Sequence, residues 1–344
     1  MKDPDEHFVV FEAYALNAAH PHTLHLGRLV AESGRKAINT YNLKKRSYIA
    51  TTSMDAELSL VTANLALAAE GKLAYDPFMG TASFPLACAH FGASVFGSDL
   101  DGRSIRGKKG QNVRGNFKQY GTEANYLGGF VADLTNTPLR LPQSHDTPRF
   151  LDAILADPPY GVREGLKVLG STKAALQEVV LLSNGTPAHL ADTYIPPKRP
   201  YSFTRMLDDV LDFAARALVD RGRLCMWMPV AGATASDDND EADGVQQQQQ
   251  GEYAIPRHPA LELVSECTQH FNKWSRRLLT YRRLSDNDVD AEALLAYQTQ
   301  RLAVTAAALE EGTADSMNDF RRKYFQGFRD PAVPAKFEKL PHAY

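Results

Sequence analysis

Four apolar segments of this chain each end in an aspartate, and their order constrains the fold more than any other feature. The segments cover residues 72–76, 94–98, 129–132 and 152–156. The acids at their ends are Asp76, Asp99, Asp133 and Asp157. Helical patterns separate the segments, which predicts a parallel sheet covered by helices on both faces. Parallel strands end at one edge, where open sheets bind ligands, so the four carboxylates should share one site.

Further strands complete the expected sheet. Residues 223–228 form a fifth strand candidate after the four segments that end in acids. Two apolar stretches, 263–271 and 278–284, are expected to form an antiparallel hairpin at the sheet edge. We therefore expect an α/β, Rossmann-like fold with a mostly parallel seven-stranded sheet and an antiparallel edge hairpin.

Helices are expected before and between these strands. Residues 51–70 have a helical pattern, with Thr52 or Ser53 as a plausible N-cap. Residues 84–90 and 205–219 are the clearest helices between strands.

The organisation along the chain predicts three parts. Residues 1–50 are polar and irregular and are expected to be a remnant of, or linker to, an upstream region. Residues 51–285 are expected to be the catalytic domain, and residues 286–344 a helical C-terminal tail beginning at 291–309.

Two segments interrupt the expected domain. Residues 161–203 are an insertion that leaves the ligand-binding end of a strand and is placed to act as a lid or a substrate loop. Residues 232–257 are a low-complexity loop that contains the glutamine run Gln246–Gln250.

Composition excludes several classes of protein. The chain has 344 residues, 44% of them hydrophobic, and a net charge of −3, whereas a stand-alone nucleic-acid binder usually has a basic excess. No apolar run reaches the roughly 18 residues of a membrane span, and the N-terminus lacks a signal-peptide core. The three cysteines lack the spacing of metal ligands or disulfides, so we expect no metal site and a cytoplasmic location.

The loops after the strands predict a cofactor site. Gly80 allows a tight turn before a helix whose N-terminus suits an anionic group. Asp99 is placed to bind a ribose diol and Asp133 an adenine amino group. An adenosine with a diol and no required phosphate fits S-adenosyl-L-methionine better than a nucleotide. The residues expected to bind it are Thr51, Thr52, Ser53, Asp76, Phe78, Gly80, Thr81, Asp99, Leu100, Asp133 and Leu134.

The run Asp157-Pro158-Pro159-Tyr160 predicts the reacting centre. The Asp157 carboxylate and the Pro158 carbonyl can both accept hydrogen bonds from an exocyclic NH2 group. The two prolines stiffen the turn, and Tyr160 offers a flat face on which an extruded base can stack. Arg163 is placed to contact a substrate phosphate, although an ion pair with Glu164 or another acid is equally consistent with the sequence.

Several motifs resemble one family of methyltransferases. These are Lys45–Leu58, Asp76–Thr81, His90–Ala93, the run Asp157–Gly165 with its Gly-Val-Arg-Glu-Gly continuation, and Phe271–Leu278 with Phe-Asn-Lys-Trp-Ser. Together they are similar to the catalytic subunit of the eukaryotic tRNA guanosine-10 N2-methyltransferases, over about residues 24–284.

The resemblance implies a fold, a reaction and partners. The fold would be that of a class I S-adenosylmethionine-dependent methyltransferase, and the reaction methyl transfer to N2 of guanosine 10 in tRNA. The family also implies a small zinc-binding activator subunit. Its N-terminal RNA-binding region with a THUMP domain has almost no counterpart in this sequence.

Two alternatives remain open at this stage. The same Asp-Pro-Pro-Tyr site occurs in methyltransferases that act on amino groups of DNA or rRNA. The second alternative is that the chain is an inactive fragment that serves only as a binding partner.

Overall fold

The computed structural model describes residues 4–142, 148–171, 173, 176, 178–191, 194–231, 254–271, 274–307 and 317–327. The chain divides into two compact units, residues Met1–Lys45 and Arg46–Tyr344. The expected glutamine run, and Asn272 and Lys273 of the Phe-Asn-Lys-Trp-Ser motif, lie outside the described residues.

The first unit contains a β-hairpin that the sequence analysis missed. Strands β1 (Phe8–Ala13) and β2 (Thr23–Arg28) pair antiparallel along their whole length. A short helix α1 (Lys36–Thr40) and a 3-10 turn η1 (Leu43–Lys45) follow. The expectation of an irregular segment was therefore wrong. The strand was not predicted because the run Phe-Val-Val-Phe does not alternate between apolar and polar residues. Side chains on both faces of this hairpin are exposed, so no buried face imposes a period of two.

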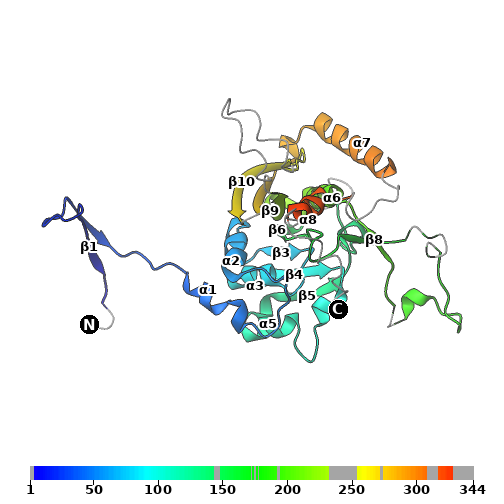
Figure 1. Cartoon of the computed structure of the whole chain (residues 1–344), viewed down its shortest axis with the longest axis horizontal. Coiled ribbons are helices and arrows are strands. Elements are labelled where there is room, and N and C mark those ends of the chain that lie inside the picture. Colours follow the sequence, from blue (N-terminus) through cyan, green and yellow to red (C-terminus); the bar gives the residue numbers. More distant parts are fainter. Residues whose placement is uncertain are drawn as a thin grey trace, which may run out of the picture. The chain divides into compact units, whose positions relative to one another are not determined.

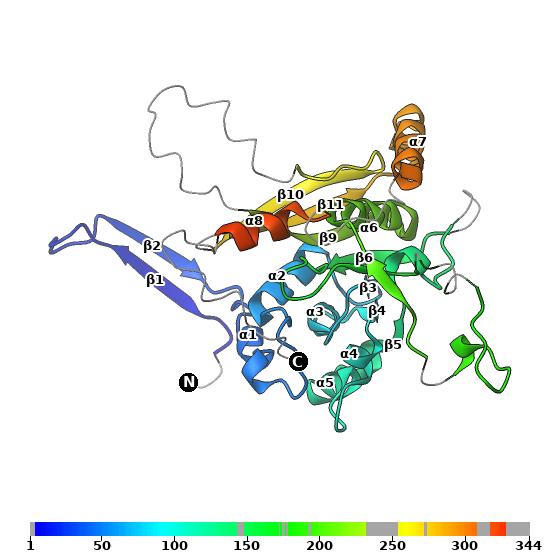
Figure 2. The ribbon, with the colours of Figure 1, turned by 45° about the vertical axis from the view of Figure 1, so that its right-hand side comes forward.

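The second unit is built on a seven-stranded sheet of order β10-β11-β9-β6-β3-β4-β5, shown in Figures 1 and 2. The strands are β3 (Leu73–Asp76), β4 (Ser94–Asp99), β5 (Tyr126–Val131), β6 (Leu151–Ala156), β9 (Leu218–Ala231), β10 (Leu261–His270) and β11 (Trp274–Arg283). The five strands β5, β4, β3, β6 and β9 are parallel, whereas β11 is antiparallel to both β9 and β10. The expected parallel sheet with an antiparallel edge hairpin is confirmed.

Alternation along β9 shows that helices cover both faces of the sheet. Met226 and Met228 belong to the apolar core formed with the helix α6 (Phe203–Ala217). Trp227 lies between them and therefore points to the opposite face. There its indole N–H donates to Thr62 Oγ1, at 3.1 Å, on the helix α2 (Ala56–Leu65).

The remaining helices of the sheet region are short. They are α3 (Ser83–His90), α4 (Gly102–Arg106), α5 (Val113–Gln119) and the 3-10 turns η2 (Glu123–Asn125) and η3 (Leu134–Asn136). Helix α2 begins later than expected. Its N-cap is Asp55, whose carboxylate accepts from the backbone N–H groups of Glu57 and Leu58, so Thr52 and Ser53 remain outside the helix.

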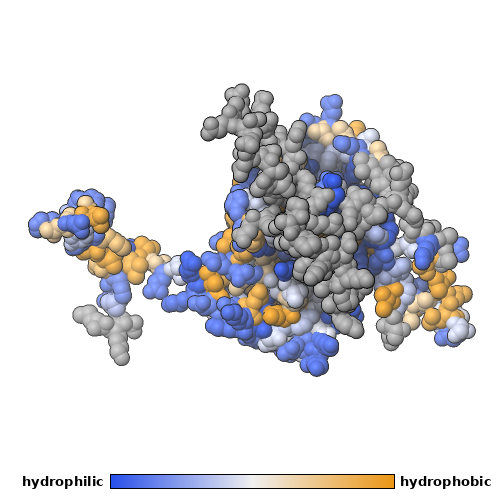
Figure 3. Space-filling model, viewed as in Figure 1, coloured by the Kyte–Doolittle hydropathy of each residue, from blue (hydrophilic) through white to orange (hydrophobic). Residues whose placement is uncertain are grey.

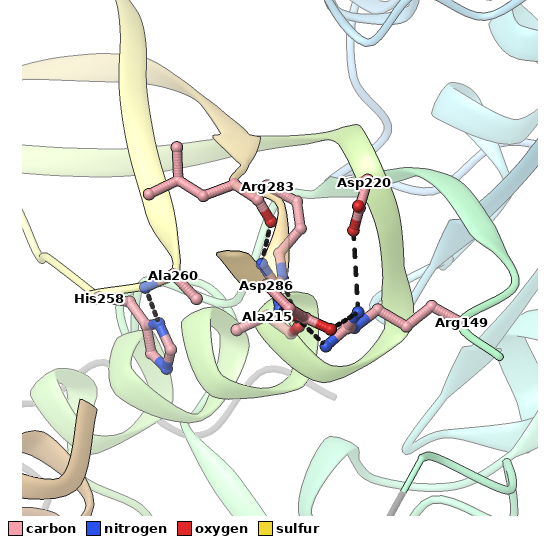
Figure 4. A network of polar contacts seen from close by, with 8 residues as sticks. Arg149, Ala215, Asp220, His258, Ala260, Arg283 and Asp286 are labelled. Atoms are coloured by element: carbon pink, nitrogen blue, oxygen red, sulfur yellow. Dashed lines mark hydrogen bonds and ion pairs between the residues drawn. The ribbon is translucent and has the colours of Figure 1, made fainter. Parts of the chain in front are cut away.

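A partly buried ion network lies at the edge of the sheet where the parallel strands begin (Figure 4). Both nitrogens of the Arg149 guanidinium, just before β6, donate to the Asp286 carboxylate at 2.7 and 3.0 Å. Arg283 at the end of β11 donates to the same carboxylate at 2.6 Å and to the carbonyl of Ala215 at 2.8 Å. These contacts lower the pKa of Asp286 to about 2, with the hydrogen bond from Arg149 the largest cause. The network ties β6, β11 and α6 together at the edge opposite the ligand site.

The insertion contains a small hairpin of β7 (Lys167–Leu169) and β8 (Lys198–Pro200), with a 3-10 turn η5 (Ala188–Leu190) between them. Apolar side chains here are largely exposed, among them Val179, Leu181 and Ile195. Figure 3 shows orange apolar atoms in this region. Within the described residues no helix is long and apolar enough to cross a membrane.

In the C-terminal region a helix, α7 (Ala291–Ala307), follows the 3-10 turn η6 (Asp286–Asp288), and the extent of the expected helical tail stays a prediction. Arg301 of α7 forms an ion pair with Asp209 and donates to the carbonyl of Asp208, both on α6. A second tail helix, α8 (Asp319–Gly327), follows.

Candidate active site

The loop after β3 lies across the end of β4. The backbone N–H of Met79 donates to the carbonyl of Ser98 at 2.9 Å, and the N–H of Gly80 donates to the Asp99 carboxylate at 2.8 Å. Gly97 has no side chain, and a Cβ there would lie 2.7 Å from both the Asp76 carbonyl oxygen and the Met79 sulfur. Gly80 itself has φ of +51°, which glycine adopts without strain. The expected proximity of Asp76, Gly80 and Asp99 is therefore present.

Two of the expected cofactor acids, the buried Asp76 and the half-buried Asp99, have raised pKa values. Asp76 is 2% exposed, and burial raises its pKa well above the usual value, with the charges of Asp99 and Asp157 adding to the effect. Its Oδ1 accepts from the N–H of Phe78 at 2.9 Å, and its other oxygen has no hydrogen-bond partner among the described residues. Burial also raises the pKa of Asp99, which the N–H groups of Asp101 and Gly80 oppose. A ligand that brings a cation or hydroxyl donors would stabilise both carboxylates.

The segment before α2 closes one side of this loop. Ser53 Oγ lies 2.7 Å from Thr81 Oγ1, as expected if the Thr51–Ser53 run packs beside the first sheet strand. Thr51 and Thr52 are exposed, and Thr81 is buried. The side chain of Phe78 is half-buried and packs against the main core, as does that of Leu134. Leu100 is half-buried, and its carbonyl accepts from Lys198 Nζ at 3.1 Å.

Three residues beside the Gly80 loop, namely Arg46, Tyr48 and Asn116, were not predicted as site residues. The Asn116 side chain exchanges two hydrogen bonds with the backbone of Tyr48, at 2.8 and 3.0 Å. Burial is the main cause that raises the pKa of Tyr48, and the negative charges of Asp101 and Asp99 raise it further. The Tyr48 ring therefore lies near those two acids. Arg46 donates to Ser83 Oγ at 2.9 Å. No local pattern marks Asn116, because its partner lies 68 residues earlier.

Both carboxylate oxygens of Asp133 accept hydrogen bonds from backbone N–H groups. It caps the turn η3, with one oxygen accepting from the N–H groups of Thr135 and Asn136 at 2.8 Å each. Its other oxygen accepts from the N–H of Leu169 at 2.7 Å. Its contact with an adenine amino group stays a prediction, and the bond to Leu169 links this strand end to the insertion.

The loop Asp157–Gly161, named the amine-binding loop for the role that its sequence predicts, begins at the end of β6. The Tyr160 hydroxyl donates to Asp157 Oδ1 at 2.6 Å. Burial raises the pKa of Asp157 to about 6, while the hydrogen bond from Tyr160 and the positive charge of Arg276 oppose that rise. Strand β6 pairs with β3, so Asp157 lies at the same edge of the sheet as Asp76, and its charge adds to the effect of burial that raises the pKa of Asp76.

Aromatic rings from distant segments surround Tyr160. Trp274 of β11 and Phe320 of α8 meet it edge-on, with ring centroids 6.2 and 6.3 Å away. Phe271 stacks on Trp274 at 4.4 Å, and the Arg276 guanidinium lies over Phe271 at 5.6 Å. The expected role of Tyr160 in stacking on a base stays a prediction. The Phe-Asn-Lys-Trp-Ser motif is the sequence signal that could have identified Trp274 as a site residue.

The two charged residues after the amine-binding loop are both exposed. Arg163 forms no ion pair with any described residue, so the alternative of a pair with Glu164 is not realised. Contact of Arg163 with a phosphate stays a prediction.

The sheet order, the antiparallel β11 and the acids at the strand ends define a class I methyltransferase fold. In sequence the chain is 40% identical over 336 residues to tRNA (guanine(10)-N(2))-methyltransferase of Saccharomyces cerevisiae, covering 95% of this chain and 69% of that protein. It is 38% identical to the Schizosaccharomyces pombe protein of the same name, covering 99% and 64%, and 33% identical to human TRMT11, covering 95% and 66%. The chain belongs to the tRNA (guanine(10)-N(2))-methyltransferase family.

Other comparisons add little. The chain spans about two thirds of the length of these relatives. No protein-family model matches it. Among solved structures, TrmN from Thermus thermophilus aligns with 76% of this chain and 57% of that chain, at a TM-score of 0.41 and 18% identity. A TM-score this low carries no functional argument.

Proposed function

We propose that this chain transfers a methyl group from S-adenosyl-L-methionine to the exocyclic N2 of guanosine 10 in tRNA. One observation carries the proposal: Asp76, Asp99 and Asp157 stand at the carboxyl ends of the neighbouring parallel strands β3, β4 and β6. The names of the relatives supply the substrate.

The residues present fit the proposed cofactor. Asp76 has a carboxyl oxygen free to accept from a ligand ammonium, and Asp99 is placed for a ribose diol. Ser53 and Thr81 supply hydroxyl groups beside the Gly80 turn. When bound, S-adenosyl-L-methionine supplies an electrophilic methyl group on a cationic sulfur. The ligand's positive charges would offset the cost of the buried carboxylates.

The chain's own residues then orient and stabilise the amine. The Asp157 carboxylate and the Pro158 carbonyl accept hydrogen bonds from the two N–H groups, which turns the nitrogen lone pair toward the methyl donor. The nitrogen gains positive charge as its bond to carbon forms, and the Asp157 carboxylate stabilises that charge. With a pKa of about 6, this carboxylate can also accept a proton that leaves the nitrogen near neutral pH.

The experiment is a methyl-transfer assay with labelled S-adenosyl-L-methionine on tRNA, tRNA with guanosine 10 replaced by adenosine, rRNA and DNA. We expect label in tRNA only, lost when guanosine 10 is replaced. The Asp157→Ala variant should lose at least about 100-fold in kcat. Label in rRNA or DNA at a comparable rate would favour the alternative substrates, and no binding of S-adenosyl-L-methionine in calorimetry would favour an inactive fragment.

We also propose a small zinc-binding activator as partner. The family resemblance supports it, and within the described part of the chain no group of His, Cys, Asp and Glu could hold a metal ion, so the zinc would belong to the partner. Co-expression with the candidate activator should yield a one-to-one complex with greater activity, and independent elution of the two chains would contradict the proposal. A cytoplasmic location stays a prediction that microscopy of the tagged chain can test.

A further inference from the structure

The C-terminal segment Met317–Gly327 contacts the backbone of the amine-binding loop. Asn318 is 1% exposed, and its side-chain amide donates to the carbonyl of Tyr160 at 2.9 Å. Arg321 donates to the carbonyl of Gly161, the next residue. Two consecutive carbonyls of the loop are thus bonded to one short segment almost 160 residues later in the chain.

The Asn318 side chain is itself held in one orientation. Its Oδ1 accepts from the backbone N–H of Arg321 at 3.0 Å, which makes Asn318 the N-cap of α8. The amide group therefore presents its N–H side to Tyr160. Gly161 has φ of +82°, and a Cβ there would lie 2.4 Å from the Asn318 amide nitrogen. The loop and the cap fit each other closely only because residue 161 is glycine.

Side chains of the same helix hold the Tyr160 ring. Phe320 is 1% exposed and packs against both Tyr160 and Trp274, with ring centroids 6.3 and 5.8 Å away, so the three rings form a triangle. Tyr324, one turn later, also meets Trp274 edge-on at 6.4 Å. A swing of the Tyr160 side chain about χ1 would carry its hydroxyl away from Asp157, to which it donates at 2.6 Å. Packing by Phe320 opposes that swing and so keeps the hydroxyl on the carboxylate that is proposed to receive the amine.

The segment is also joined to the end of the insertion. The backbone N–H of Phe203, the first residue of α6, donates to the carbonyl of Met317 at 3.2 Å. Helix α8 thus lies where the insertion returns to the sheet, beside the loop from which the insertion leaves.

We propose that Met317–Gly327 positions the amine-binding loop for the guanine amino group, with Asn318 and Phe320 as positioning residues. This inference rests on the proposed function of the same site. The segment acts through Tyr160 and Gly161 and does not need to touch the cofactor.

Two variants separate positioning from simple folding of α8. Asn318→Ser and Asn318→Asp both keep an oxygen that caps the helix, but neither can donate to Tyr160 as the amide does. The matched control is Arg322→Gln on the same helix, since Arg322 is exposed and pairs with Asp319 of its own turn. All are tested in the full chain with its activator.

We expect each Asn318 variant to lower kcat about tenfold, which corresponds to the loss of one hydrogen bond, with the affinity for S-adenosyl-L-methionine within twofold of wild type. The pH at half-maximal rate should move upward, because a loosened Tyr160 no longer lowers the pKa of Asp157. Arg322→Gln should match wild type. An unchanged kcat and pH midpoint, or equal losses in Arg322→Gln, would overturn the proposal.

Hydrogen exchange keeps this test independent of the substrate. Amides of the peptide 157–166 should exchange faster in Asn318→Ser than in wild type, and those of β3 and β4 should not change. If the wild-type chain is inactive on tRNA but this exchange difference is present, the proposed substrate is wrong and the positioning role stands. If exchange at 157–166 is unchanged, the positioning role is wrong whatever the activity.

Discussion

The buried carboxyl of Asp157 should reduce the stability of the fold that it serves. We therefore expect the Asp157→Asn variant to be more stable than wild type at pH 8 and nearly inactive. Asparagine has almost the same size and keeps an oxygen that accepts from the Tyr160 hydroxyl, so the main change is the loss of the charge.

The size of the effect follows from the pKa. Burial raises the pKa of Asp157 from 3.8 to about 6 in the folded chain. At 1.36 kcal/mol per pKa unit, this difference costs the folded state up to about 3 kcal/mol once the group is ionised in both states. Because the folded pKa is the higher one, the folded state binds the proton more tightly. The favourable contribution is complete below pH 3.8 and disappears as the pH rises through about 6.

The assay is urea unfolding followed by the fluorescence of Trp227 and Trp274, without cofactor, from pH 4 to pH 8. The free energy of unfolding of Asp157→Asn minus that of wild type should increase by up to about 3 kcal/mol between pH 4 and pH 7. Methyl transfer should fall by about 100-fold or more. A difference that stays constant with pH, or a variant less stable than wild type at pH 8, would refute the argument that burial dominates at this carboxyl.

Three further predictions concern other sites. Asp99→Asn should weaken S-adenosyl-L-methionine binding about tenfold in calorimetry, because one charged hydrogen bond to a diol, about 1.4 kcal/mol, is lost. The melting temperature should change little. An unchanged affinity would show that Asp99 is not part of the site. His258, whose pKa burial lowers to about 4, should make wild type lose stability as the pH falls from 6.5 to 4, and His258→Gln should lose less over that range in urea unfolding. Arg149→Ala should destabilise the chain by about 1–2 kcal/mol at pH 7 after allowance for the partial exposure of Asp286. That loss should shrink as the pH falls through 3.8 toward about 2, where Asp286 is protonated in wild type, and a constant loss would contradict the ionic role.

The sequence predicted the centre of the sheet because β3, β4 and β6 are largely buried apolar runs that each lead to an acid. Asp76 ends β3, Asp99 ends β4, and Asp157 directly follows β6. At these positions the apolar pattern that predicts a strand and the acid that predicts a binding site occur together. The hairpin β1–β2 was missed because neither of its faces is buried, which leaves no alternation to read.

The site was predicted where its residues are local in sequence and missed where they are not. The Asp76–Thr81 loop and the amine-binding loop carry their own signals. Asn116, Trp274 and Asn318 reach the site from other elements, far in sequence from the two loops, and asparagine is a residue type that is common on ordinary surfaces. The start of α2 was misplaced because Thr52, Ser53 and Asp55 are all good N-caps, and only the geometry at Asp55 decides among them.

The two halves of the site should form at different times during synthesis of the chain. In the cofactor half, the bonds from Gly80 to Asp99 and between Ser53 and Thr81 span 19 and 28 residues. The contacts of Asn318 and Arg321 with the amine-binding loop span 158 and 160 residues. The N-terminal part of a domain leaves the ribosome first, and contacts of long sequence separation form late. The contacts of the amine-binding loop are complete only after residue 321 has left the ribosome. We therefore expect a nascent chain to bind the methyl donor before it can orient an amine.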